Sequence, residues 1–445
     1  MPWEPMIINS KKTTTTAALL ILTGVFLSAP AAADSGHDFI DEARLFYDAV
    51  ACANGGTDAR GMPARTIKVH CRELKDPVRR FQKRYVQRAA RFLAKRRPAG
   101  LPTTVVYPFG GGDLVSALVS YPDAVDITTM SLEHAGDPRR FHLLRGQQLQ
   151  DKLLLFRETV KGLLNLHDST SKNLRKMEKG ALPGQLSFFM LALVATGHEP
   201  VALRFFRIQD DGSLHYYSKA EIEGLEDTKI KKKERRWVDS DYSIAFSNAE
   251  LQFRPIGDQS GKILVHRHIA ANLDNEHFAN SPLYKFLTAK GRVSTMTKAA
   301  SYLLWLKDFS AIRDYLLDHM EFMFSDSTGI PPLYAKRKGM VQRTYGVFTG
   351  SFLKASQFHN EQFLKLWESQ PQRGLPFRYG YTDSADNYHM MITEPRAAVR
   401  RRAAEKKAMR RAKKKAMRST EKKAMRSTEK KAMRSTEKKA MSPTP

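Results

Sequence analysis

The segment from Thr103 to Glu133 constrains the fold of this chain more than any other. A β-branched run, TTVVY, ends at Tyr107 and is followed by the turn PFGGGD, which closes at Asp113. A helix-like LVSALVSYP comes next, and a second β-branched run, VDITTM, begins at Val125. Strand, glycine-rich turn, helix and strand in this order are typical of a βαβ unit. We therefore predict an α/β fold, with a mixed α+β arrangement as the alternative.

The glycine-rich turn is the first candidate for a ligand site. Gly110, Gly111 and Gly112 let the chain turn tightly, and the N-terminus of the helix that follows favours an anion. Glu133 lies 21 residues after Gly112, near the spacing of the ribose-binding acid in dinucleotide folds. The turn lacks the full G-x-G-x-x-G pattern, however, and Asp113 brings a negative charge where a phosphate would approach. The three glycines are the expected cofactor-binding residues, and the cofactor is unknown.

Asp113 and Glu133 form the candidate catalytic pair. Both are expected at the carboxyl ends of strands, where open α/β sheets place ligands. Two carboxylates at that place could act as general acid and base or hold a divalent cation. The alternative is structural: Asp113 caps the helix that follows, and Glu133 is a solvated acid.

The first 33 residues have the order of a secretory signal peptide. Lys11 and Lys12 form a basic start, Ala17–Phe26 is uncharged, and small residues lead to a cleavage site after Ala33. A retained anchor would need about 20 apolar residues, and this run is shorter. We therefore expect an exported protein, periplasmic or extracellular, with no transmembrane segment after cleavage.

Cys52 and Cys71 are the two cysteines of the chain. In an exported protein, an even cysteine count favours a disulfide between them. The alternative, two unpaired thiols, applies if the chain stays in the cytosol. Two cysteines alone do not predict a metal site, because zinc takes four ligands.

The last 50 residues carry most of the chain's positive charge. From Arg396 to Pro445, twenty Lys or Arg residues against four Glu residues give a net charge of +16, out of +27 for the whole chain. The octad KKAMRSTE begins at Lys414 and recurs at Lys422 and Lys430. Little in this tail is apolar enough to bury, so we predict a disordered tail, with a transient helix on an anionic surface as an alternative. A perfect tandem repeat can also arise by replication slippage without a function. Its expected partners are anionic envelope polymers or lipid headgroups, whereas export makes nucleic acid an unsuitable partner.

Between the signal peptide and the tail, residues 34–395 are expected to form one globular α/β domain, with a subdivision near 180–280 as an option. A helical layer is expected to close the domain at its C-terminal end, and the block Gly329–Phe352 is expected to be irregular. Helices are predicted over the region 37–98 and over Leu144–Leu166, Gln185–Thr196, Leu283–Leu287, Thr295–Leu306, Ser310–Phe324 and Leu353–Glu368. Strands are predicted over Val201–Ile208, Leu214–Tyr217, Ala249–Ile256 and Lys262–Ala270.

Five short blocks resemble a family of secreted bacterial proteins with no established activity. The blocks are YPFGGGD from Tyr107, SLEHAG from Ser131, KAASYL from Lys298, SDSTGIP from Ser325 and TYGVFTG from Thr344. The resemblance implies a shared fold and export, and it brings no catalytic residue with it.

Three further groups of residues are candidate sites. His266 and His268 point the same way on a predicted strand and could bind a metal with Asp274, Glu276 or His277. Ser351 and Lys354 match the S-x-x-K motif of penicillin-binding enzymes, without that family's partner motifs. Asp326, Tyr334 and Tyr345 could form a pocket wall, with core packing of the aromatic rings as the alternative. The residues are as they stand in the chain.

Two functions remain open at this point. One is an envelope enzyme with its site at the glycine-rich turn, near Asp113 and Glu133. The other is a non-catalytic interaction protein that uses its basic tail on anionic envelope surfaces. The sequence does not decide whether the protein is an enzyme.

Overall fold

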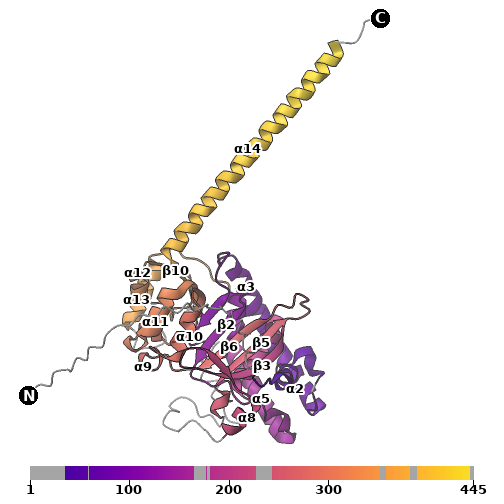
Figure 1. Ribbon diagram of the computed structural model, residues 1–445, viewed down its shortest axis with the longest axis vertical. Coiled ribbons are helices and arrows are strands. Elements are labelled where there is room, and N and C mark those ends of the chain that lie inside the picture. The colour runs from indigo at the N-terminus through magenta and orange to yellow at the C-terminus, as the bar shows by residue number, and fades with distance from the viewer. Residues whose placement is uncertain are drawn as a thin grey trace, which may run out of the picture. The chain divides into compact units, whose positions relative to one another are not determined.

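The computed structural model describes residues 36–58, 60–164, 177, 181–226, 243–350, 357–380 and 388–440 (Figure 1). The residues from Gly36 onward form one compact unit. The expected signal peptide, the S-x-x-K motif at Ser351 and the charged run 229–236 lie outside the described residues.

The region that follows Gly36 is helical, as predicted. It contains α1 (Ile40–Leu45), α2 (Ala64–Phe81) and α3 (Gln87–Ala94), joined by π-helical turns at Phe46–Val50 and Gln82–Val86 and a 3-10 turn at Ala53–Gly56. In α2, Ile67, Cys71 and Leu74 are buried at helical spacing, while the basic side chains face solvent.

The predicted βαβ unit is confirmed. Strand β1 (Thr104–Tyr107) pairs in parallel with β2 (Asp126–Ser131), and α4 (Leu114–Ser120) connects them. Residues on β1 alternate between two hydrophobic cores: Val105 and Tyr107 contribute to one, and Val106 contributes to the other. Both faces of the sheet are therefore covered, as in other α/β folds.

A single ten-stranded mixed sheet organises the described residues, and its order is β4-β3-β5-β6-β2-β1-β7-β8-β10-β9. The five central strands, β6 to β8, run parallel, and the outer strands pair antiparallel. The remaining strands are β3 (His198–Ile208), β4 (Leu214–Tyr216), β5 (Asn248–Pro255), β6 (Leu264–Ala270), β7 (Val293–Thr297), β8 (Met320–Ser325), β9 (Met340–Gly346) and β10 (His389–Pro395). The predicted fold class is thus confirmed.

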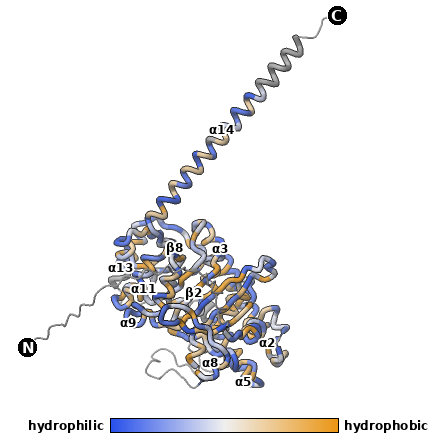
Figure 2. Tube along the Cα trace, viewed as in Figure 1, coloured by the Kyte–Doolittle hydropathy of each residue, from blue (hydrophilic) through white to orange (hydrophobic). Residues whose placement is uncertain are grey.

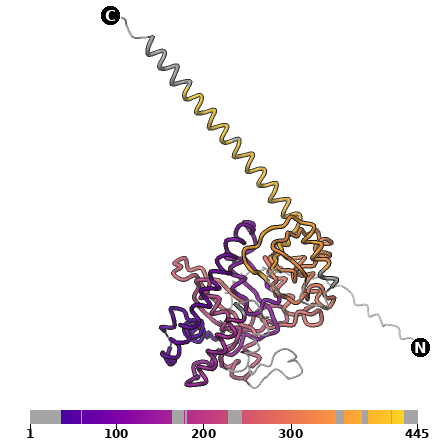
Figure 3. The backbone as a smooth tube through the Cα atoms, turned by 180° about the vertical axis from the view of Figure 1, so that it is seen from behind, coloured from indigo at the N-terminus to yellow at the C-terminus, as the bar shows by residue number. Residues whose placement is uncertain are grey.

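Helices cover both faces of this sheet. The first core contains α4 and the largely buried α7, and the second contains α10 and α11. Views from opposite sides show α2 and the orange C-terminal elements toward opposite ends of the sheet (Figures 1 and 3). The remaining helices of the body are α5 (Gly146–Leu164), α7 (Gly184–Thr196), α8 (Lys219–Gly224), α9 (Asn275–Phe278), α10 (Pro282–Ala289), α11 (Ser310–His319), α12 (Pro332–Arg337) and α13 (Gln357–Glu368).

The C-terminal third contains a helical layer, but it also supplies four strands that the sequence reading missed. The helix predicted over Thr295–Leu306 is wrong, because this segment begins in β7 and contains only a 3-10 turn at Leu303–Trp305. The helix predicted over Ser310–Phe324 ends at His319, and β8 begins at the next residue. The block Gly329–Phe352, predicted as irregular, contains α12 and β9. Strands β7 and β8 are buried on both faces, and a short, continuously buried run cannot be told from a buried helix by its pattern alone.

The C-terminal tail is a helix where the sequence predicted disorder. Helix α14 (Arg396–Ala440) continues directly from β10. Ala398 is buried and Arg402 pairs with Glu394, but every described side chain from Ala403 to Thr428 is exposed. Figure 2 shows hydrophilic positions in blue along this helix, with more hydrophobic positions in orange between them. Alanine, lysine, arginine, glutamate and methionine all favour helix, so the tail is helical without a buried face.

Candidate functional site

The order of the parallel strands defines where a ligand would bind. Numbered along the chain, the strands β6-β2-β1-β7-β8 have the order 3-2-1-4-5, which is the order of Rossmann-type folds. From β1 the chain passes through α4 to β2, which lies on one side of β1 in the sheet. After β6 it passes through α10 to β7, which lies on the other side of β1. The order therefore reverses between β1 and β7, and open α/β sheets bind ligands outside the carboxyl ends of the strands at such a point. We call this place the carboxyl edge.

Asp113 stands at the carboxyl edge as a structural residue. It is the N-cap of α4, where its carboxylate accepts a hydrogen bond from the Ser116 backbone N–H at 3.3 Å. The same carboxylate accepts from the Tyr107 hydroxyl at 3.1 Å and forms an ion pair with Lys298 Nζ at 3.1 Å. Lys298 also donates to Ser116 Oγ at 3.0 Å. These contacts tie the turn after β1 to the end of β7, and they match the helix-cap alternative weighed from the sequence.

Glu133 follows β2 at the same edge and has a different environment. Only 5% of the residue is exposed. Its backbone is held at both ends: the N–H donates to Ser131 Oγ at 3.3 Å, and the carbonyl accepts from His268 Nε2 at 2.8 Å. Among the residues that the structure describes, none donates a hydrogen bond or ion pair to its carboxylate. A carboxylate accepts hydrogen bonds and donates none, so this group is available to the donors of a ligand.

Gln185 is the residue that sequence reasoning missed. It lies in the first turn of α7, it is 2% exposed, and neither its amide oxygen nor its amide nitrogen has a partner in the described part of the chain. A Cβ on Gly111 would lie 3.7 Å from Gln185 Nε2 and 3.7 Å from Ser131 Oγ. The signal was present in the sequence, because Gln185 has the largest polar side chain of a mainly apolar helix.

The glycines of the turn have separate roles. A Cβ on Gly110 would lie 2.6 Å from the Tyr107 ring, so only glycine fits against this buried aromatic side chain. Gly111 has a left-handed φ of 47° and lies beside Ser131 and Gln185. All three glycines are buried, Gly112 included. The turn that was predicted to bind a cofactor therefore borders the unpartnered Gln185 amide.

A second polar cluster follows β7 and β8 along the same edge. Asp326 accepts hydrogen bonds from the backbone N–H groups of Ala299 and Thr328, both at 2.8 Å. Ser327 Oγ lies 2.9 Å from His389 Nε2 and 2.8 Å from the Tyr302 hydroxyl. The donors and acceptors here are largely satisfied by one another, so this cluster shapes the loops after β7 and β8.

Tyr334 and Tyr345, which the sequence grouped with Asp326, lie apart from this cluster. The Tyr345 ring packs edge-on against Phe92 at 5.5 Å, and the Arg313 guanidinium lies 3.8 Å from the centre of the Tyr334 ring. Both aromatic side chains have the packing role that was the alternative to a pocket wall.

His266 and His268 point the same way, as predicted, but they face the protein core. Thr129 Oγ1 lies 2.9 Å from His266 Nε2 and 3.3 Å from His268 Nδ1, and Phe189 packs against both rings. Burial lowers the pKa of both histidines, that of His266 well below its ordinary value, so both are neutral.

The other proposed metal ligands are engaged elsewhere. Asp274 caps α9 and accepts from His277 Nδ1 at 2.7 Å, while Glu276 is exposed. The one group of metal-ligand type within the described ranges is Cys52, His70 and Cys71, and there the two sulfurs form the predicted disulfide. The disulfide is therefore confirmed, and those sulfurs are not metal ligands in this state.

Comparisons with protein-family models, curated proteins and solved structures found no match to this chain. Across the described residues, no helix combines the length and the apolar character needed to cross a bilayer.

Proposed function

We propose that this chain is an exported envelope enzyme whose ligand site lies at the carboxyl edge, over the glycine-rich turn. One observation carries the proposal: the buried Gln185 amide has no protein partner among the described residues, and it lies with Ser131 beside Gly111, where the strand order reverses. Glu133 follows Ser131 at the same edge, and its carboxylate has no donor among the described residues. Buried polar groups are almost always satisfied in folded proteins, so the unsatisfied Gln185 amide favours a ligand at this place. The disulfide, which persists in oxidising compartments, supports export.

The two carboxylates predicted as a catalytic pair then take different roles. Asp113 holds Lys298 and caps α4, so it positions the turn. Glu133 has no competing protein donor among the described residues, so it is the group that can accept a hydrogen bond or a proton from a bound molecule. Gln185 can both donate to and accept from the same molecule.

A stability comparison tests this assignment without knowledge of the ligand. Glu133→Gln breaks no hydrogen bond or ion pair of the carboxylate within the described residues, and it is expected to change the free energy of unfolding by less than about 0.5 kcal/mol. Gln185→Met fills a similar volume without a polar atom and is expected to leave that free energy unchanged or slightly raised. Urea unfolding of the ligand-free protein measures both.

Glu250 provides the matched control, because it is as buried as Glu133 but forms an ion pair with Arg267 at 2.8 Å. Glu250→Gln is expected to lower the free energy of unfolding by about 2 kcal/mol, since Arg267 loses this charged partner and keeps only Asp126. If Glu133→Gln or Gln185→Met destabilises the protein by more than about 1 kcal/mol, these side chains are structural and the proposed site is wrong.

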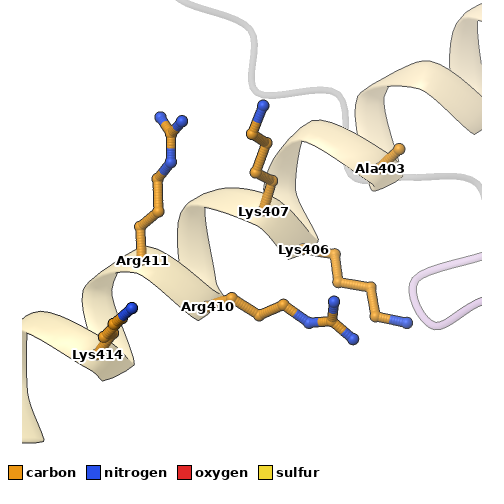
Figure 4. Close-up of a pocket in the computed structure, with 6 residues that line it drawn as sticks. All are labelled: Ala403, Lys406, Lys407, Arg410, Arg411 and Lys414. Atoms are coloured by element: carbon orange, nitrogen blue, oxygen red, sulfur yellow. The ribbon is translucent and has the colours of Figure 1, made fainter.

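The basic tail supports a second function, contact with anionic envelope polymers or lipid headgroups. Figure 4 shows five basic side chains projecting from one stretch of α14, and none of them has an acidic partner among the described residues. They are Lys406, Lys407, Arg410, Arg411 and Lys414. Clusters of four to eight such residues are attracted to anionic surfaces, at about 1 kcal/mol per residue.

Vesicle binding tests this second function. Full-length protein is expected to bind phosphatidylglycerol vesicles and not phosphatidylcholine vesicles, with binding that weakens as salt is raised. Substitution of the five residues by Gln should reduce binding at least tenfold. The matched control substitutes five basic residues on the outer face of α2 and the segment after it: Arg79, Arg80, Lys83, Arg84 and Arg88. Equal loss in both variants would mean that net charge, and not the tail, drives the contact.

A further inference from the structure

We infer that the ligand of the carboxyl edge presents a vicinal diol to Glu133 and carries no phosphate at the glycine-rich turn. This inference rests on the proposed function, because it names the ligand class of the same site. It follows from the acceptors and charges around Gly111, Ser131, Glu133 and Gln185.

We infer a diol from the hydrogen bonds that the Glu133 carboxylate can accept. An ionised carboxylate accepts hydrogen bonds and donates none, and its two oxygens can accept from two adjacent hydroxyl groups at once. The residue follows the second strand of a 3-2-1-4-5 sheet, where an acidic side chain in Rossmann-type folds accepts from ribose hydroxyls. Gln185, whose amide both donates and accepts, suits the ring oxygen and hydroxyls of the same polyol or the edge of an attached base.

We infer that no phosphate binds at the turn, because Asp113 already occupies the place where it would bind. Its carboxylate fills the anion position at the start of α4, by accepting from the Ser116 backbone N–H. Lys298, the cation of this turn, is held by that same carboxylate at 3.1 Å. His268, which donates to the Glu133 carbonyl, is kept neutral because burial lowers its pKa. A phosphate at the turn would therefore meet the Asp113 carboxylate, which already occupies the helix terminus.

Two sources supply a vicinal diol without a phosphate at that position. One is the ribose of a nucleoside, and the other is a pyranose ring of an envelope carbohydrate. The shared chemistry is a pair of adjacent hydroxyls directed at a carboxylate, and the two sources differ in whether a base accompanies it.

Isothermal titration of the full-length, disulfide-bonded protein separates these sources. The nucleoside arm uses adenosine, S-adenosylmethionine, 2′-deoxyadenosine and AMP, and the carbohydrate arm uses maltotriose. One arm is expected to bind. In the nucleoside arm, loss of the 2′-hydroxyl should weaken binding at least tenfold, and AMP should bind no more tightly than adenosine. In either arm, Glu133→Gln should weaken binding at least tenfold, while Glu276→Gln, at an exposed glutamate, should leave it unchanged.

Two results would overturn the inference. If AMP binds more tightly than adenosine, a phosphate binds at the turn and that part of the inference is wrong. If no compound binds in either arm, the ligand does not present a vicinal diol. If either result is found while Glu133→Gln and Gln185→Met show the expected stability, the proposed site stands and its ligand belongs to another class. If those two substitutions destabilise the protein, the proposed site itself is wrong.

Discussion

At the scale of single residues, burial decides which groups carry charge. His70 is 1% exposed and lies between two fixed partners, the Val50 carbonyl at 2.9 Å from Nε2 and Arg157 Nη1 at 3.0 Å from Nδ1. Arginine can only donate, so Nδ1 accepts and Nε2 carries the proton. Burial, with the nearby Arg157 charge adding to it, lowers the pKa of His70 to about 4. The ring is therefore neutral in the folded protein near neutral pH.

This histidine predicts a loss of stability in mild acid. The unfolded chain takes up a proton near pH 6.5, whereas folded His70 resists protonation until about pH 4. Its contribution is thus fully present above pH 6.5 and is lost as pH falls toward 4, by about 3 kcal/mol in total. Urea unfolding at pH 7 and pH 4.5 measures the loss, and His70→Gln should show a smaller one. An identical pH dependence in both proteins would contradict this account.

At the scale of elements, amphipathic helices and the βαβ unit were predictable, and doubly buried strands were not. The helix α7 was recognised because its apolar run ends at Gly197, which has a left-handed φ of 76°. In contrast, β7 and β8 have no exposed face to give an alternating pattern, so their apolar runs were assigned to helices.

The disulfide gives the prediction that belongs to this scale. Cys52 and Cys71 are separated by 19 residues and join the turn after α1 to α2, with a Cα–Cα distance of 5.3 Å. Closing a loop of this size restricts the unfolded chain, so reduction is expected to lower the free energy of unfolding by about 3 kcal/mol. Guanidinium unfolding with and without a reductant measures the change. A Cys52→Ser, Cys71→Ser variant should lose the sensitivity to reductant, and an insensitive wild-type protein would argue against the bond.

At the scale of the whole molecule, one sheet brings together residues that are distant in sequence. The segment near 180–280, considered as a possible subdivision, supplies β3 to β6, and β6 pairs with β2 in the same sheet. The pairing places His268 beneath Glu133, and α7 brings Gln185 to Gly111. The candidate site therefore needs the complete sheet, because no local segment contains its groups.

The sequence by itself determined the βαβ unit, the disulfide pairing and the residues of the glycine-rich turn. These features depend on short-range physics: β-branched runs, glycine conformations and a closed loop. Only the tertiary structure decided that Asp113 is a cap paired with Lys298, that Glu133 is buried without a partner, and that Gln185 lies beside Gly111. The physical reason is that ion pairing and burial depend on neighbours more than 50 positions away in the chain, and a local pattern carries no record of them.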